Sequence, residues 1–352
     1  MRIRRVLFAA LALAVLGLFG LAVGRGQAQV PKLVVYTYDS FVAWGPARFI
    51  EEEFERTHDY GVDVVFVATA DSRAMLARLI EELAAGGPTA DVFIGVEAAD
   101  LAKVWEHELF IPLTPEEVPN LAVVPEELLV DPTRSAIPYE HGYITFVYDS
   151  ERLPTEEVPR TFEELLSSKY RKMLILEDPR TSSPGLSFLL WTIHRFGEPG
   201  YLDYWRELLP NVLTITVGWS EAYDLFLAGE APIVLSFSTD TAYSVIEHGS
   251  LRYRIMLLDN QGYRNIYLMG VVRRTAQEEL AKELVNFVLS PAVQERIPTT
   301  EWMFPANPEA LLPVLWYQHA VVPPQSVMIS PEEVGENLER WLREWARVVV
   351  GR

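Results

Sequence analysis

The chain has 352 residues, with 49 acidic and 30 basic side chains, a net charge of −19 and no Cys. So acidic a surface repels the phosphate backbone of nucleic acids, and we therefore expect no nucleic-acid partner. Without Cys the chain forms no disulfide and carries no lipid on a lipobox cysteine, and its length exceeds one typical core, which favours two lobes.

The amino-terminal segment has the pattern of an export signal. Three Arg fall within the first five residues, and an uncharged apolar run, 6–23, follows them. Gly26 and Ala28 are small residues at suitable positions for cleavage, so we predict a signal peptide over 1–28 and a periplasmic mature protein. Its removal takes away four Arg and no acid, which leaves the mature chain at −23. A membrane anchor is the alternative, because the run is nearly long enough to span a bilayer.

After the leader, segments typical of strands alternate with segments typical of helices, which predicts an α/β fold. The predicted strands are short runs rich in apolar and β-branched residues: 33–38, 62–68, 91–95, 142–148, 173–177, 212–217, 233–239, 255–258 and 267–272. The predicted helices are 46–58 (with Pro46 at its first position), 75–83, 98–107, 186–196, 202–209, 220–228, 277–289 and 332–349. Repeated strand–helix units imply parallel-rich sheets that bind ligands at the carboxyl ends of their strands.

No Gly/Ser-rich linker interrupts this pattern, so we expect ordered extended segments to connect the two lobes. The best candidates for the two hinge crossings are 138–148 and 236–257. The predicted organisation is lobe 1 over 30–142 and 252–315, lobe 2 over 143–251, and a C-terminal helical segment, 316–352, packed on the lobes. The expected fold is therefore a two-lobed α/β fold with mixed, mostly parallel sheets and two hinge crossings.

The first candidate binding segment is 36–46, which reads Tyr-Thr-Tyr-Asp-Ser-Phe-Val-Ala-Trp-Gly-Pro at the end of a predicted strand. The rings of Tyr38 and Trp44 can cover a planar ligand, and an aromatic face attracts a cation by roughly 0.5–2 kcal/mol. Asp39 can accept hydrogen bonds or offset a positive charge. In the structural alternative, Tyr38 and Trp44 anchor the core and Asp39 is a turn residue.

The second candidate is the loop 181–185, where Thr181, Ser182 and Ser183 place three hydroxyl groups before a helix. Ser183 is expected to cap that helix, with Pro184 at its first position. Free amides at a helix N-terminus beside hydroxyl groups also form a phosphate site, and the two roles are compatible.

Trp219 is the third candidate, just before a helix that Ser220 is expected to cap. A tryptophan at that position would pack on an apolar residue one turn later, but the corresponding position is Asp224. This weakens the structural explanation and favours a Trp219 ring that faces a ligand.

The segments 36–46, 178–185 (Asp-Pro-Arg-Thr-Ser-Ser-Pro-Gly) and 218–223 (Gly-Trp-Ser-Glu-Ala-Tyr) resemble those of the thiamine-binding periplasmic proteins of bacterial ABC importers. The resemblance covers nearly the whole chain after the leader and implies a type II periplasmic-binding-protein fold. It implies a monomeric receptor that delivers thiamine, and also its phosphate esters, to an ABC permease. The ligand residues it implies are Tyr38, Trp44, Trp219 and Tyr243 for the rings, Asp39 and Asp71 for the aminopyrimidine or the cation, and Thr181, Ser182, Ser183 and Gly185 for the phosphate end.

Other functions have weaker support in the sequence. A polyamine receptor would use carboxylates with aromatic walls, and a ferric-ion receptor would use paired tyrosines such as Tyr36 and Tyr38. An enzyme on the same fold is a further alternative, but thiaminase I, which resembles these receptors, uses a nucleophilic Cys that this chain lacks. The six His are scattered, and nucleotide-binding or Gly-x-Ser-x-Gly patterns are absent from the sequence, so we expect no catalysis, no metal and no cofactor.

Overall fold

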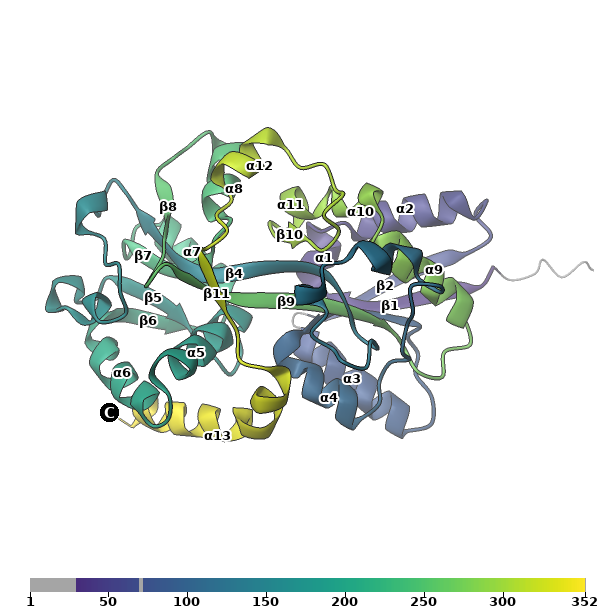
Figure 1. Cartoon of the computed structure of the whole chain (residues 1–352), viewed down its shortest axis with the longest axis horizontal. Helices are drawn as coiled ribbons and strands as arrows, with labels where there is room; N and C mark the ends of the chain where they lie inside the picture. Colours follow the sequence, from purple (N-terminus) through teal and green to yellow (C-terminus); the bar gives the residue numbers. More distant parts are fainter. Residues whose placement is uncertain (1–29, 70–71, 352) are drawn as a thin grey trace, which may run out of the picture.

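The computed structural model describes residues 30–69 and 72–351. Two lobes lie side by side, and the long strands β4 (Ile137–Asp149) and β9 (Gln261–Val271) run from one lobe to the other (Figure 1). The predicted signal peptide, 1–28, and the candidate residue Asp71 lie outside the described residues.

The strands form one continuous hydrogen-bonded sheet that passes through both lobes. Its order is β2 (Asp63–Thr69), β1 (Lys32–Tyr38), β3 (Val92–Glu97), β9, β4, β7 (Ile233–Phe237), β5 (Leu174–Glu177) and β6 (Val212–Thr216). The parallel pairs β2–β1–β3 and β7–β5–β6 form the outer blocks, and antiparallel pairs connect them through β9 and β4. Three shorter strands pair at the edges of the crossings: β8 (Tyr253–Met256) and β10 (Phe304–Pro305) with β4, and β11 (Gln325–Val327) with β9.

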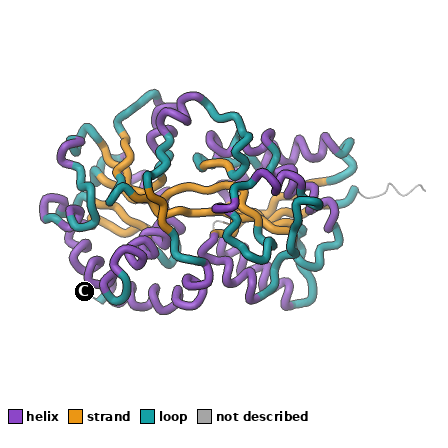
Figure 2. The backbone as a smooth tube through the Cα atoms, viewed as in Figure 1, coloured by secondary structure: helices purple, strands orange, loops and turns teal. Residues whose placement is uncertain are grey.

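Helices cover the sheet of each lobe, and Figure 2 shows them around the strands. The α-helices are α1 (Asp39–Ala43), α2 (Ala47–Thr57), α3 (Ser72–Ala84), α4 (Leu101–Glu106), α5 (Ser183–Phe196), α6 (Gly200–Leu208), α7 (Trp219–Leu227), α8 (Asp240–His248), α9 (Glu278–Val288), α10 (Pro291–Gln294), α11 (Ile297–Thr300), α12 (Val314–His319) and α13 (Pro331–Val350). Short 3₁₀ turns are η1 (Ala98–Asp100), η2 (Pro119–Val123), η3 (Glu126–Leu128), η4 (Thr155–Glu157), η5 (Glu164–Leu166), η6 (Ser168–Tyr170) and η7 (Leu209–Asn211).

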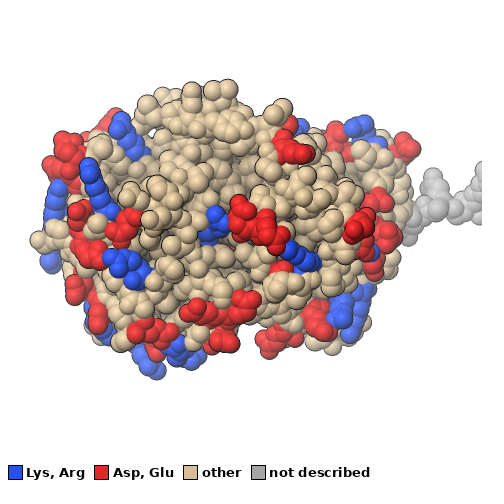
Figure 3. All heavy atoms as spheres, viewed as in Figure 1, with Lys and Arg blue, Asp and Glu red and all other residues tan. Residues whose placement is uncertain are grey.

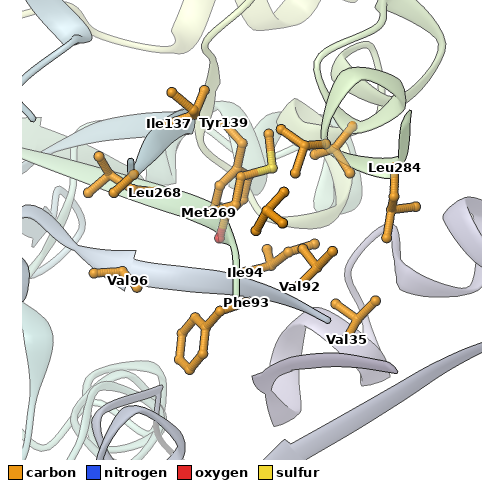
Figure 4. Close-up of a cluster of buried hydrophobic side chains, with 14 of the residues drawn as sticks. Val35, Val92, Phe93, Ile94, Val96, Ile137, Tyr139, Leu268, Met269 and Leu284 are labelled. Carbon is orange, nitrogen blue, oxygen red and sulfur yellow. The ribbon is translucent and has the colours of Figure 1, made fainter. Parts of the chain in front are cut away.

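Each lobe has its own hydrophobic core. In lobe 1, Val35 of β1, Phe93 and Ile94 of β3 and Met269 of β9 are buried together (Figure 4). The lobe 2 core is richer in aromatic rings, and Trp205 of α6 lies edge-on against Trp345 of α13, with 5.6 Å between ring centroids. Such a pair contributes roughly 0.5–1.5 kcal/mol beyond the burial of its area. The C-terminal helix α13 therefore belongs to the lobe 2 core, and it also packs against α4 of lobe 1.

The return crossing differs from the predicted one. The predicted crossing 236–257 contains β8, which pairs with β4 and places Met256 in the lobe 2 core, so the boundary at residue 252 is too early. The chain returns instead along β9. The sequence predicts the lobe 1 end of β9 from its apolar residues. It does not predict the lobe 2 end, because the polar residues Gln261, Arg264 and Asn265 interrupt the apolar pattern there.

Two local predictions near the site also change. α1 was not predicted, and it begins directly after β1, so Asp39 lies in its first turn. Pro46 is the N-cap of α2 and not its first helical residue. α8 was missed as well, because its sequence, Asp-Thr-Ala-Tyr-Ser-Val-Ile-Glu-His, mixes β-branched and polar residues without a long apolar stripe.

Candidate functional site

The candidate residues gather at the carboxyl ends of parallel strands, on both sides of the crossing strands. Tyr38 ends β1 in lobe 1. In lobe 2, Ser183 begins α5 after β5, and Trp219 begins α7 after β6. Tyr243 lies on α8, which follows β7. Open α/β sheets bind their ligands at this end.

Tyr38 forms the lobe 1 side of the site. Its phenol lies 3.0 Å from the hydroxyl of Tyr139 and donates to Glu301 Oε2 at 3.0 Å and to Glu140 Oε1 at 3.4 Å. Burial, with the charge of Glu301 next, raises the pKa of Tyr38 well above 10. The phenol therefore stays protonated and acts as a hydrogen-bond donor.

The two carboxyl groups behind Tyr38 hold protons more tightly than exposed acids. Burial raises the pKa of Glu301 to about 7, and burial together with the charge of Glu301 raises the pKa of Glu140 well above 4.5. Oε1 of Glu301 lies against the turn at Gly45, where a Cβ would come within 2.0 Å of it. Glu301 therefore links Tyr38 to the turn between α1 and α2.

The hydroxyl loop before α5 is a helix cap, but with a different residue in the capping position. Ser182, not Ser183, is the N-cap, and its Oγ accepts from the amide of Gly185 at 3.4 Å. A tight turn precedes the helix: the amides of Thr181 and Ser182 both donate to the carbonyl of Asp178, and the helix starts one residue earlier than predicted. Pro184 consequently occupies the second helical position and not the first.

Each hydroxyl of this loop already has a partner. Thr181 Oγ1 donates to the carbonyl of Val217 at 2.7 Å, and Ser183 Oγ lies 3.2 Å from the hydroxyl of Tyr267. Gly185 allows close packing, because a Cβ there would lie 2.5 Å from the carbonyl oxygen of Glu177. The guanidinium of Arg180 bonds to the carboxylate of Asp178.

Tyr267 on β9 connects the loop to lobe 1. Its ring centroid lies 6.4 Å from that of Tyr38, while its hydroxyl contacts Ser183 of lobe 2. Asn265, two residues earlier on the same strand, donates to Ser183 Oγ at 3.4 Å. The crossing strand thus brings Tyr38 and Ser183, predicted separately, into one site.

Trp219 and Tyr243 belong to an aromatic cluster in lobe 2. The Trp219 ring stacks on Tyr223, with 4.9 Å between centroids, and its indole N–H donates to Ser236 Oγ at 2.8 Å. Tyr243 lies 6.5 Å from Tyr223 and 4.9 Å, edge-on, from Trp302. The cluster therefore reaches from α7 across α8 to the segment after α11.

The start of α7 differs from the prediction in a way that matters for Trp219. Gly218 is the N-cap and Trp219 is the first helical residue, so Ser220 does not cap the helix. The packing partner of the indole is then Tyr223, four residues later on the same face, and not position 224. Trp219 has a structural contact that the sequence interpretation had not identified.

Comparison with known proteins identifies the family. Residues 87–329 match the family described as bacterial extracellular solute-binding protein. The chain belongs to this family. It is 36% identical to a thiamine-binding periplasmic protein of Brucella abortus, over 89% of this chain and 91% of the relative. It is 35% identical to a protein of the same name from Escherichia coli, over 91% of this chain and 94% of the relative.

A solved structure agrees with the relationship. The solute-binding protein superposes on a periplasmic thiamin binding protein with a TM-score of 0.79 and 34% identity, over 92% of this chain and 98% of that one. The two-lobed fold expected from the sequence is therefore confirmed. Within 30–69 and 72–351 of the solute-binding protein, no helix is both long and apolar enough to cross a membrane.

Some predicted residues do not join the site of the solute-binding protein. Asp39 is exposed in the first turn of α1, and Trp44 is 73% exposed on the turn before α2. Tyr36 is buried and donates to Glu82 of α3, whereas Tyr38 faces Glu140 and Glu301, so the two phenols do not form a pair. Over the described residues, no group of three or more His, Asp or Glu side chains is placed to hold a metal ion.

Trp302 is the functional candidate that sequence reasoning missed. Its backbone has a φ of 56°, in the left-handed region that bulky residues rarely adopt, and it follows Glu301, the partner of Tyr38. Trp302 is thus held between the lobe 1 phenol network and the ring of Tyr243 in lobe 2. Its sequence surroundings, Thr-Thr-Glu-Trp-Met, carry no turn or strand signal, and only the contacts of Glu301 and Tyr243 reveal it.

Proposed function

We propose that this protein is an exported, monomeric receptor that captures thiamine in the periplasm and delivers it to an ABC permease. The observation that carries the proposal is two groups of aromatic side chains where the two lobes meet: Tyr38 with Tyr267, and Trp302 with Tyr243 and, through Tyr223, Trp219. The names of the relatives give the ligand: they are thiamine-binding proteins that align over most of this chain.

The chemistry of the site suits a flat cation. Aromatic faces attract a positive ring by roughly 0.5–2 kcal/mol each, and thiamine carries a thiazolium cation beside an aminopyrimidine. The phenol of Tyr38 remains a donor because burial keeps its pKa well above 10. Its single O–H already donates to Glu301, so Tyr38 offers the ligand its aromatic face. Phosphate esters of thiamine are further candidate ligands, since amides at the start of α5 can accept an anion.

The protein acts by binding and release, with no cofactor and no covalent step. The crossing strands β4 and β9 connect the lobes, and the ligand touches side chains of both, so it favours a closed arrangement that the permease reads. Asp39, Asp71 and Trp44 remain candidates for contacts that form in that closed arrangement.

Calorimetric titration of the purified mature protein with thiamine, spermidine and ferric citrate tests the proposal. We expect saturable one-to-one binding of thiamine, and neither other compound should displace it. A protein that binds spermidine or ferric citrate but leaves thiamine unbound would instead be a polyamine or iron receptor.

A further inference from the structure

The carboxyl ends of β5 and β7 carry buried polar groups that the contacts within lobe 2 leave unused. Glu177 ends β5 and is 1% exposed, and Asp240 begins α8 and is 5% exposed. Apart from the backbone amide of Glu177 itself, the carboxylate of Glu177, Oδ2 of Asp240 and the hydroxyl groups of Ser238 and Thr239 have no hydrogen-bond partner among the described residues. Buried polar groups in proteins almost always have hydrogen-bond partners. Several buried polar groups without partners in one place therefore indicate a site that binds a polar ligand.

Asp240 lies at the base of the aromatic cluster. Ser236 receives the indole N–H of Trp219 at 2.8 Å and hydrogen-bonds the carboxyl of Asp240. Burial raises the pKa values of Tyr223 and Tyr243, and the negative charge of Asp240 raises both further. The carboxyl is therefore within electrostatic reach of the rings that would hold the ligand.

Glu177 lies behind the hydroxyl loop. Its carbonyl oxygen packs against Gly185, and the charge of Asp240 adds to burial in raising its pKa well above 4.5. The basic residue of the loop, Arg180, is held by Asp178 and faces the ring of Trp345. Within 30–69 and 72–351, neither Glu177 nor Asp240 forms an ion pair with a basic side chain.

We propose that Asp240 and Glu177 form an acidic floor at the lobe 2 end of the site, which selects the cationic ring of the ligand over a phosphate group. This inference rests on the proposed function and adds a ranking to it: thiamine binds more tightly than thiamine monophosphate. Asp240 is the specificity-determining carboxylate, and Glu177 adds a second negative charge within its electrostatic reach.

The ranking follows from the charges. A cation above the rings stabilises the ionised carboxylate of Asp240, whose burial otherwise makes that charge unfavourable. A phosphate at the start of α5 would instead approach Glu177, and Asp240 beyond it, with a like charge, or require these acids to keep their protons. In a buried site such a like-charge contact weakens binding strongly, because little water screens it.

The test compares the affinities for thiamine and thiamine monophosphate in four forms of the mature protein: wild type, Asp240→Asn, Glu177→Gln and Asp224→Asn. Asp240→Asn and Glu177→Gln keep the shape of the side chain and remove its charge. Asp224→Asn is the matched control, because Asp224 is exposed on α7 and the substitution changes the net charge by the same amount. A neutral isostere of thiamine, with thiophene in place of thiazolium, is the third ligand.

We expect the wild type and Asp224→Asn to favour thiamine over both other ligands by about tenfold or more. In Asp240→Asn both preferences should fall to about threefold or less, and Glu177→Gln should move them in the same direction by a smaller factor. The inference is overturned if the wild type binds the monophosphate as tightly as thiamine, or if Asp240→Asn keeps the preferences of the wild type. In either case thiamine binding, and with it the proposed function, stands. A wild type that does not bind thiamine would instead contradict both the proposed function and the inference that rests on it.

Discussion

Trp219 combines two contacts on one side chain: its ring stacks on Tyr223 and its indole N–H binds Ser236. Both contacts fix the ring orientation before any ligand arrives. A ring fixed in this way loses little conformational entropy on binding, which favours affinity.

Trp219→Ala should weaken thiamine binding by about 1–3 kcal/mol, the combined scale of an aromatic stack and a cation–π contact. Titration of the intrinsic fluorescence measures it, because thiamine stacked on Trp219 should quench the wild type more than the variant. Trp219→Phe is the control: it keeps a ring on Tyr223 and should recover most of the affinity. Wild-type affinity in a folded Trp219→Ala protein would contradict the stack.

Ser182, and not Ser183 as the sequence predicts, caps α5. Because Ser182 caps α5, Ser182→Ala should lower the free energy of unfolding by about 0.5–2 kcal/mol, measured by urea denaturation. Ser183→Ala, whose hydroxyl contacts Tyr267, should instead change ligand binding, and it should affect thiamine monophosphate more than thiamine. Equal losses of affinity for the two ligands in Ser183→Ala would mean that the loop does not contact phosphate.

The buried acids behind Tyr38 make the stability depend on pH. Burial raises the pKa of Glu301 from 4.5 to about 7, so the folded protein binds this proton more tightly than the unfolded chain does. The stability that this proton contributes is present below about pH 4.5 and is lost as the pH rises through about 7.

We therefore expect the melting temperature of the wild type to fall between pH 5 and pH 8, and Glu301→Gln to flatten this decrease. Calorimetric scans across that range, with the exposed Glu336→Gln as control, give the comparison. The same slope in Glu301→Gln and in the control would show that this carboxyl does not titrate as its burial indicates.

At the scale of elements, α13 is held against both lobes at once. It packs on α6 through the lobe 2 core, and its Gly335 comes so close to Ala102 of α4 that an added Cβ would lie 2.3 Å from the Cβ of Ala102. Neither helix backbone can move freely at this contact. Even the methyl group of an Ala at position 335 would therefore strain the packing of α13 on α4.

Gly335→Ala should destabilise the protein by about 1–3 kcal/mol, the usual cost of overpacking. In an Ala102→Gly background the clash is gone, and the same substitution should stabilise by up to about 1 kcal/mol, because Ala favours a helix over Gly. Urea denaturation of the four proteins in this cycle measures both effects. Effects of the same sign in both backgrounds would contradict the close contact.

The elements that the sequence predicts correctly are those with one consistent pattern. β1, β2, β5 and β6 are apolar and β-branched, and α9 and α13 carry regular apolar stripes, so local preference and burial agree. Prediction fails where local preference and burial disagree. The lobe 2 end of β9 carries polar residues that bond to other segments, Gln261 to Trp191 and Gln325, and Asn265 to Ser183, and the apolar pattern of a strand is lost there.

The candidate site shows the same limit. Tyr38, Ser183, Trp219 and Tyr243 can be found from local motifs and family resemblance, and the structure places them in one connected region. Trp302, Glu301 and Asp240 cannot, because their significance lies in contacts between segments far apart in the chain. No local signal in the sequence distinguishes a buried, unpaired Asp240 from an ordinary helix-starting acid.

At the scale of the whole molecule, acidic side chains are spread over both lobes on the face shown in Figure 3. Their mutual repulsion favours solubility and offers a diffuse attraction to a cationic ligand, limited to about 8 Å at physiological ionic strength. Specificity must therefore come from the site between the lobes and not from the overall charge.

Closure of the two lobes over thiamine should reduce the radius of gyration. In the proposed complex the ligand contacts Tyr38 in lobe 1 and the Trp219–Tyr243 cluster in lobe 2, so binding would favour the arrangement in which these are nearest. Small-angle scattering of the mature protein with and without saturating thiamine measures the change, with spermidine as the control ligand. Identical profiles would indicate a receptor that is already closed before it binds.

The crossing strands also determine when each part of the molecule can form during synthesis. Most of lobe 2 is inserted between the two halves of lobe 1, and β3 obtains its neighbour β9 only after the lobe 2 elements from β5 to β8 have been made. Contacts between such distant segments form slowly, because a long loop must close first. A nascent chain that meets the export machinery before β9 has been made therefore lacks the strand that connects β3 to β4, and we expect its first lobe to stay unfolded and able to thread through the membrane until then.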